Sequence, residues 1–80
     1  MARVLWTRAA QNVLIDLPVA LQEEIARKTR PLARFPRMYP VRQHGRFRRH
    51  RHFLVKVWIV FYRVVDNTVY IRGLWPARIP

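Results

Sequence analysis

The chain has 80 residues, of which 51% are apolar and 12% aromatic, which predicts a single folded domain spanning residues 1–80 and excludes a disordered basic tail. Cysteine is absent, which excludes disulfides and thiol chemistry and fits a cytoplasmic location. Sixteen Lys and Arg against four acidic residues give a net charge of +12, which predicts a polyanionic partner, either nucleic acid or a ribonucleoprotein.

The first half of the chain has the pattern of a short strand followed by two helices. Residues 3–6 form the expected strand, and Thr7 is suited to cap a first helix of about ten residues. Asp16 and Pro18 then introduce a second helix that runs from about Val19 into the early thirties. The residues expected on the inward face of this helix are Leu21, Ile25, Leu32, Phe35 and the aliphatic stem of Lys28.

The second half of the chain has the alternation typical of strands. Residues 46–52 are expected to be extended, with arginines and histidines of even number on one face. Residues 57–65 have the β-branched and aromatic content of a strand buried on both faces. Because no turn residue separates these two stretches, they are either two paired strands or one long bent strand, and we favour two.

A final strand, residues 69–75, follows the hairpin candidate Asp66-Asn67 and ends at Pro76. Trp58, Phe61 and Trp75 are expected in the core. The order β-α-α-β-β-β predicts an α+β domain in which two helices pack on one face of a small antiparallel sheet. The other face of the sheet is expected to be open. The longest apolar run, residues 53–65, is too short and too charged to span a bilayer, so no membrane partner is expected.

Five segments together carry a family likeness: residues 4–10 (VLWTRAA), 16–18 (DLP), 32–36 (LARFP), 58–64 (WIVFYRV) and 69–78 (VYIRGLWPAR). In these segments the chain resembles the RelE/ParE superfamily, the toxin halves of bacterial type II toxin–antitoxin pairs. The resemblance covers nearly the whole chain. It implies a cognate antitoxin partner whose extended segment, expected to be acidic, masks the open face of the sheet.

The superfamily divides by target: RelE-like members cut mRNA in the ribosomal A site, and ParE-like members poison DNA gyrase. The short first helix and the length favour the RelE-like branch. The resemblance places the second-strand basic positions on His50 and His52 and the late arginine on Arg78. Two departures count against this branch: Ile59 occupies the third-strand arginine position, and the sequence ends at Pro80 without a terminal Tyr or His.

Metal-free RNA cleavage needs a base, an acid and cations that stabilise the phosphorane. His50 and His52 suit the proton transfers, and Arg48 and Arg78 suit the charge stabilisation. The function favoured by the sequence is therefore ribosome-associated mRNA cleavage that inhibits translation. The basic residues expected to contact nucleic acid are Arg42, Arg46, Arg49, Arg51 and Lys56.

Neither a metal nor a cofactor is expected, since no ligand cluster or glycine-rich phosphate loop is present. Two alternatives stay open: a gyrase poison without nuclease activity, and a non-enzymatic RNA- or DNA-binding module.

Overall fold

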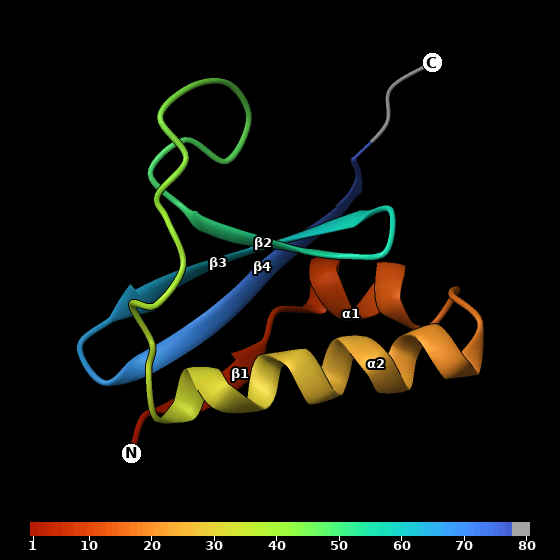
Figure 1. Ribbon diagram of the computed structural model, residues 1–80, viewed down its shortest axis with the longest axis horizontal. Coiled ribbons are helices and arrows are strands. Elements are labelled where there is room, and N and C mark those ends of the chain that lie inside the picture. Colours follow the sequence, from red (N-terminus) through yellow and green to blue (C-terminus); the bar gives the residue numbers. More distant parts are fainter. Residues whose placement is uncertain (78–80) are drawn as a thin grey trace.

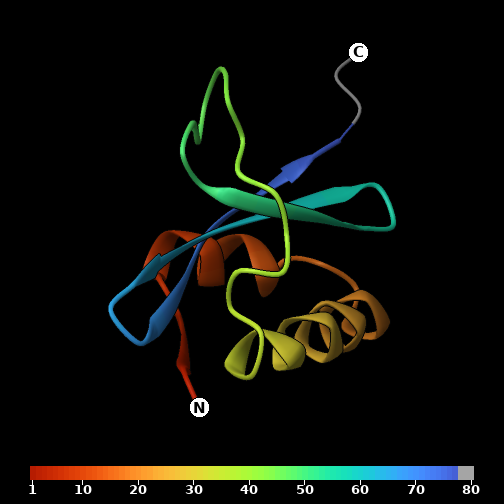
Figure 2. The ribbon, with the colours of Figure 1, turned by 60° about the vertical axis from the view of Figure 1, so that its left-hand side comes forward.

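The computed structural model describes residues 1–77 and contains a four-stranded sheet with two α-helices on one side of it (Figure 1). The elements are β1 Arg3–Trp6, α1 Arg8–Leu14, α2 Val19–Thr29, a 3-10 helix Arg30–Ala33, β2 Arg51–Val55, β3 Trp58–Val65 and β4 Thr68–Pro76. The long connection from the 3-10 helix to β2 runs past the sheet and forms a loop on the side away from α2 (Figure 2).

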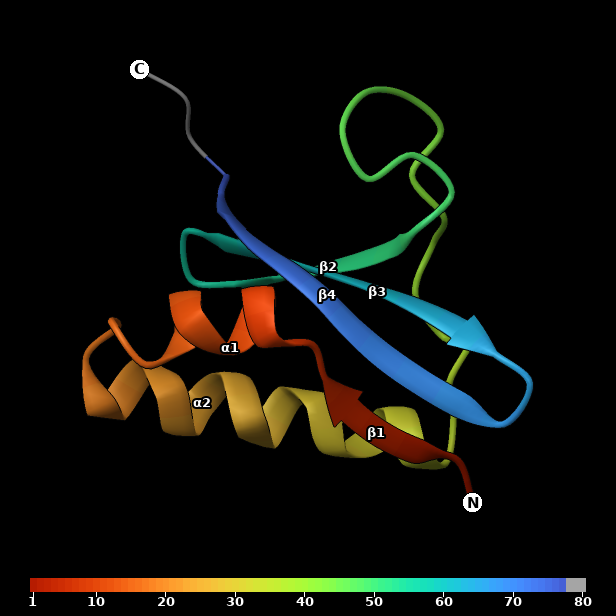
Figure 3. The ribbon, with the colours of Figure 1, turned by 180° about the vertical axis from the view of Figure 1, so that it is seen from behind.

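The strands are arranged in the order β1-β4-β3-β2. Hairpins make β2, β3 and β4 antiparallel neighbours, whereas β1 pairs with β4 in parallel. The predicted α+β class is confirmed, but the sheet is mixed and not antiparallel throughout. The parallel pair arises because the helical connection carries the chain from the β1 edge to the β2 edge before the hairpins return it (Figure 3).

The helices bury one stripe of side chains against the sheet. Ile25 and Leu32 are fully buried, as expected, but the position between them on the stripe is filled by Thr29, which is 5% exposed. The expectation that Lys28 and Phe35 face inward was wrong: Lys28 is exposed, and Phe35 lies beyond the 3-10 helix with 57% of its surface exposed. Thr29 tolerates burial because its hydroxyl donates to the Ala26 carbonyl oxygen at 2.8 Å.

Local signals set most of the element boundaries. Thr7 caps α1 as predicted, since its Oγ1 accepts from the Ala10 amide at 3.3 Å. The Asp66-Asn67 hairpin is confirmed, with Asp66 at a φ of 54°. The two-strand interpretation of the preceding stretch is also confirmed, and the turn lies at Lys56 and Val57, with Lys56 at a φ of 56°.

The expectation of a strand over residues 46–52 was wrong for most of its length. Residues 46–49 form a turn, and β2 begins only at Arg51. Phe47 and Arg49 have φ values of 64° and 72°, which no strand residue adopts. This left-handed backbone turns the loop back over the sheet, and it carries the Phe47 ring onto the face opposite the helices.

Tyr62, at the centre of β3, anchors the connection that leads to β2. Its side chain is fully buried, and its hydroxyl donates to the Pro36 carbonyl oxygen at 2.9 Å. Burial raises the pKa of the Tyr62 hydroxyl, which keeps it in the protonated form that donates.

A Tyr62→Phe variant should therefore be less stable by about 1–2 kcal/mol, because the Pro36 carbonyl loses its donor. The free energy of unfolding from urea titration measures this loss. Tyr70→Phe is the matched control, since Tyr70 is only partly buried and its hydroxyl makes no hydrogen bond in the described residues. Equal stability of the two variants would contradict the anchoring role.

Candidate functional site

The face of the sheet opposite the helices is partly covered by one aromatic side chain from the loop. The Phe47 ring stacks on Phe61 of β3, with 4.5 Å between the ring centroids and 13° between the ring planes. It also lies directly over Gly73 of β4, where an added Cβ would come within 2.4 Å of the ring. Phe47 thus packs in a shallow cradle whose floor exists only because position 73 has no side chain.

A bulge in β4 places Gly73 under the ring. Phe61 pairs with Gly73, but the next residue, Tyr62, pairs with Ile71, so Arg72 is an extra residue in β4. The bulge therefore directs Gly73 to the open face and Leu74 to the core, where Leu74 is 4% exposed.

Two arginines from the loop lie over aromatic rings next to this cradle. The Arg46 guanidinium carbon is 4.7 Å from the centroid of the Trp75 ring, and that of Arg42 is 5.3 Å from the centroid of the Phe61 ring. Arg42 is further held by its Nε, which donates to the His44 carbonyl oxygen at 2.9 Å. We call Arg42, Arg46, Phe47, Phe61 and Trp75 the aromatic–arginine cluster.

The aromatic–arginine cluster borders a cavity of about 310 Å³, whose floor includes Ile59. Trp75, which was expected in the core, is 41% exposed here, because β4 presents it to the open face. Within residues 1–77 the only ion pair joins Lys56 Nζ to Glu24 Oε1 at 3.9 Å. The guanidinium groups of Arg42 and Arg46 therefore have no carboxylate partner in the described part of the chain and remain available to an external anion.

The structure brings His50 and His52 to this face, where each ring lies near an aromatic side chain. The His50 ring meets the edge of Phe47 at 5.4 Å, and the His52 ring lies 6.1 Å from Phe61. Nε2 of His50 and Nδ1 of His52 are buried and have no hydrogen-bond partner in the described residues. His50 Nδ1 lies 3.2 Å from the Arg48 carbonyl oxygen, a distance at which it donates in the matching tautomer. Burial lowers the pKa of His50 below 6.5, and the nearby Arg72 and Arg63 lower it further.

This lowered pKa makes the stability of the loop depend on pH. Neutral His50 is the form that the fold buries, so its contribution is fully present above pH 6.5 and is lost as the pH falls through the lowered pKa. The urea midpoint should therefore decrease between about pH 7.5 and pH 5.5. The decrease should be smaller in His50→Gln and unchanged in His44→Gln, whose parent side chain is exposed. Identical pH profiles for all three proteins would contradict this role of His50.

The remaining predicted site residues are dispersed. Arg48 and Arg49 are exposed in the turn, and Arg51 points to the helix side of the sheet, where it donates to the Tyr39 carbonyl oxygen at 2.7 Å. Lys56 lies at the opposite end of β2, in the hairpin turn. Arg78 lies outside the described residues.

Sequence reasoning missed Phe47 and Gly73 as parts of the site. The signal that would have found them is the glycine inside an otherwise apolar strand, which is typical of a bulge or of a close approach by another group. Phe47 stands alone among arginines and histidines, and its burial depends on a turn that no local sequence signal marks.

The arrangement is chemically suited to binding. Guanidinium groups that stack on aromatic rings present fixed donors to carboxylates or phosphates. Among residues 1–77 there is no group of three or more His, Asp or Glu side chains placed to hold a metal ion. No helix in the described part of the chain is long and apolar enough to cross a membrane.

A family comparison decides the class of the protein. The family described as "ParE toxin of type II toxin-antitoxin system, parDE" matches residues 4–79. The chain belongs to the ParE toxin family. It is thus a toxin of the RelE/ParE superfamily, as its sequence motifs had indicated. No curated protein sequence matches this ParE-family toxin.

Solved structures share the fold of this ParE-family toxin at low sequence identity. The RelBE2 complex from Mycobacterium tuberculosis contains a chain with a TM-score of 0.80 and 20% identity, and the match covers 96% of the toxin and 93% of that chain. A chain of the chromosomal ParDE system from P. aeruginosa has a TM-score of 0.77 and 15% identity, and the match covers 98% of both chains. The isolated E. coli RelE toxin has a TM-score of 0.81 and 14% identity, and the match covers 100% of this toxin and 88% of RelE. Because structures of both branches match about equally well, the fold does not distinguish their targets.

Proposed function

We propose that this toxin stops growth by binding DNA gyrase through the aromatic–arginine cluster and that it does not cut RNA. Membership of the ParE family supports a gyrase target, since ParE-like members of the superfamily poison this enzyme. The cluster supports a binding mode, because it presents two cations and an exposed tryptophan on one face. Arginine and tryptophan are the residue types that most often dominate protein interfaces.

The position of His50, the first of the two candidate histidines, is the main argument against cleavage. A general base must come within hydrogen-bond distance of the proton that it removes. His50 Nε2 and His52 Nδ1 are instead buried without a hydrogen-bond partner among residues 1–77, and Phe47 lies against the His50 ring. Ile59 also lines the cavity at the position where RelE-like members have an arginine.

Ribosome-dependent mRNA cleavage is the second candidate, with the site His50, His52, Arg48 and Arg78. One observation favours it: burial lowers the pKa of His50, which favours its free-base form. In this case the loop would have to move before Nε2 of His50 reached a 2′-hydroxyl group. Arg42, Arg46, Arg49, Arg51 and Lys56 would then serve as contacts to RNA.

An antitoxin is the second partner that we propose. Two of the structural relatives come from toxin–antitoxin systems of RelBE and ParDE type, and a net charge of +12 favours an acidic binding segment. Both candidate targets place the toxin in the cytoplasm.

The test uses purified toxin in two parallel assays. The first measures supercoiling and the accumulation of cleaved DNA by gyrase, and the second follows a reporter mRNA by primer extension in a purified translation system. We expect gyrase to be inhibited at toxin concentrations that leave the mRNA intact.

Cuts in the mRNA that require ribosomes, with normal supercoiling, would overturn the gyrase proposal. A His50→Ala/His52→Ala variant that lost these cuts would then assign the nuclease site. Growth arrest in cells with neither effect in vitro would exclude both targets.

A further inference from the structure

The open face of the sheet carries two adjacent rows of side chains that run across β2, β3 and β4. Strand pairing places His52, Phe61 and Gly73 opposite one another in the first row. The Phe47 ring covers this row, since it stacks on Phe61 and lies over Gly73. The first row is therefore closed by the protein itself.

The second row, two residues further along each strand, is apolar and has a cavity above it. It consists of Leu54, Ile59 and Trp75, which are paired in the same way. Leu54 is 60% exposed and Trp75 is 41% exposed. Phe47 meets Trp75 only at an angle, with 6.3 Å between the ring centroids and 66° between the ring planes. The cavity of about 310 Å³ over Ile59 and Trp75 is therefore left unfilled, at the small end of the range of roughly 300–1,000 Å³ for ligand pockets.

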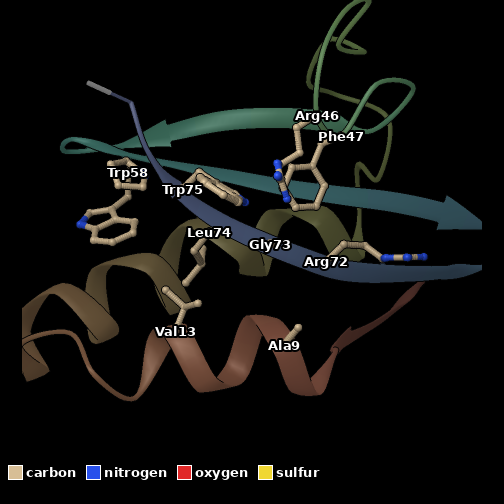
Figure 4. Close-up of a pocket in the computed structure, with 10 residues that line it drawn as sticks. Ala9, Val13, Arg46, Phe47, Trp58, Arg72, Gly73, Leu74 and Trp75 are labelled. Atoms are coloured by element: carbon tan, nitrogen blue, oxygen red, sulfur yellow. The ribbon is translucent and has the colours of Figure 1, made fainter. Parts of the chain in front are cut away.

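Two guanidinium groups stand at the rim of this cavity. Arg42 and Arg46 both line it, and Figure 4 shows Arg46 and Phe47 next to Trp75. The ring contacts use the flat face of each guanidinium, which leaves most of the N–H donors at its edge free for oxygen atoms. No side-chain carboxylate within residues 1–77 pairs with them, because Asp66 lies in the β3–β4 hairpin and the other three acids lie on or next to the helices.

We infer that this cavity binds a free purine nucleoside polyphosphate. The base lies over Ile59 against the Trp75 ring, in the layer that Phe47 forms over the first row, and the phosphates accept from Arg42 and Arg46. A nucleobase suits the row because its flat face stacks on an aromatic ring, and a purine covers more of the row than a pyrimidine does. Two separate guanidinium groups suit a chain of phosphates better than a single carboxylate.

The positions of the other cations favour a free nucleotide over a nucleic-acid strand. A strand needs a track of cations along its backbone. On the β2 side of the cavity, Arg51 instead donates to the Tyr39 carbonyl oxygen on the helix side. Lys56 lies in the hairpin turn, 3.9 Å from a Glu24 carboxylate oxygen. The cavity therefore offers phosphate contacts on the loop side, which fits a ligand with one base and one phosphate chain.

The test titrates the purified toxin with GTP at about 0.15 M salt and measures the affinity by calorimetry. We expect saturable binding that is at least about tenfold tighter than that of inorganic tripolyphosphate, since base stacking adds to the phosphate contacts. Arg42→Ala/Arg46→Ala should weaken GTP binding at least about tenfold. The matched control, Arg27→Ala/Arg30→Ala, removes the same charge from the helix side and should change the affinity by less than about twofold.

Tryptophan fluorescence locates the base. GTP should quench the emission of the toxin, and this quenching should be lost in Trp75→Leu. It should persist in Trp58→Phe, whose parent side chain packs against the core. Trp75→Leu should also weaken GTP binding about tenfold, the effect of losing one stacking contact. Thermal unfolding checks that each variant keeps the fold.

Equal affinities for GTP and tripolyphosphate would overturn the inference, since charge alone would then explain the binding. So would the absence of saturable binding up to about 1 mM GTP, equal losses in the two double-arginine variants, or quenching that persists in Trp75→Leu. A single-stranded tetranucleotide that binds more than about tenfold tighter than GTP, with the same dependence on Trp75, would overturn it in favour of a nucleic-acid strand. Because the inference does not rest on the identity of the toxin's target, the gyrase and mRNA assays decide the proposed function separately.

Discussion

Gly73→Ala should destabilise the wild-type protein but should be neutral or slightly stabilising in a Phe47→Ala background. In the wild type, a Cβ at position 73 would lie 2.4 Å from the Phe47 ring, so the ring must leave its cradle. Gly73→Ala displaces the ring and Phe47→Ala removes it. Each change should lower the free energy of unfolding by about 2 kcal/mol, because the ring is only partly exposed in the native state.

The reversal of sign in the double variant follows from the backbone of β4. Gly73 does not have a positive φ, so alanine fits the strand conformation there. Once the Phe47 side chain is removed, the added methyl group meets no ring, and alanine loses less backbone entropy than glycine on folding. In the Phe47→Ala background, Gly73→Ala should therefore raise the free energy of unfolding by up to about 1 kcal/mol.

A double-mutant cycle measured by urea unfolding tests this coupling. Additive costs for Phe47→Ala and Gly73→Ala would show that the ring does not rest on Gly73. Hydrogen exchange supplies a second measurement, since the amides of residues 41–50 should lose protection in both single variants.

Removing both guanidinium groups of the aromatic–arginine cluster should have the largest effect on function. We expect the Arg42→Ala/Arg46→Ala variant to need about 30-fold more protein for half-inhibition of gyrase. This factor corresponds to a combined loss of about 2 kcal/mol, which is typical of arginines at the centre of an interface. The physical reason is that both groups are held over aromatic rings and lack a carboxylate partner within residues 1–77.

The matched control is Arg27→Ala/Arg30→Ala, which removes the same charge from exposed positions on the helix side. It should change the inhibitory concentration by less than about twofold. Equal losses in the two variants would attribute the effect to net charge alone. Full potency of the cluster variant would place the target-binding surface elsewhere. Thermal unfolding of each variant checks that the fold is intact.

Elements with local signals were predictable from the sequence. The Thr7 cap and the Asp66-Asn67 hairpin depend on interactions within a few residues, so the sequence pattern identified them correctly. The β-branched and aromatic content likewise located β3, the alternation located β4, and the family motifs indicated the protein class. The helix stripe was correct at Ile25 and Leu32 and failed at Lys28, because the periodicity allows either of two adjacent positions to face inward.

The candidate site was predictable only in part, because its geometry depends on contacts between distant segments. The dense basic run located the loop, but strict alternation placed His50 and Arg48 on a strand that does not extend to them. Arg51 illustrates the same difficulty: its charge suggested an exposed contact, whereas its guanidinium satisfies the Tyr39 carbonyl on the helix side. A sequence pattern cannot show which of several arginines will find a partner inside the fold.

The sequence alone determined the α+β class, the order of the elements, the basic character and the toxin family, because periodicity, turn chemistry, composition and short motifs are all local properties. Only the tertiary structure decided that Phe47 covers Gly73, that Arg42 and Arg46 lie over aromatic rings, and that within residues 1–77 β1 pairs with β4 only as far as Ile71. These features join residues that are far apart along the chain. They result from the left-handed turn at residues 46–49, the bulge at Arg72 and the early end of β1, and each of these acts through packing that no short stretch of sequence contains.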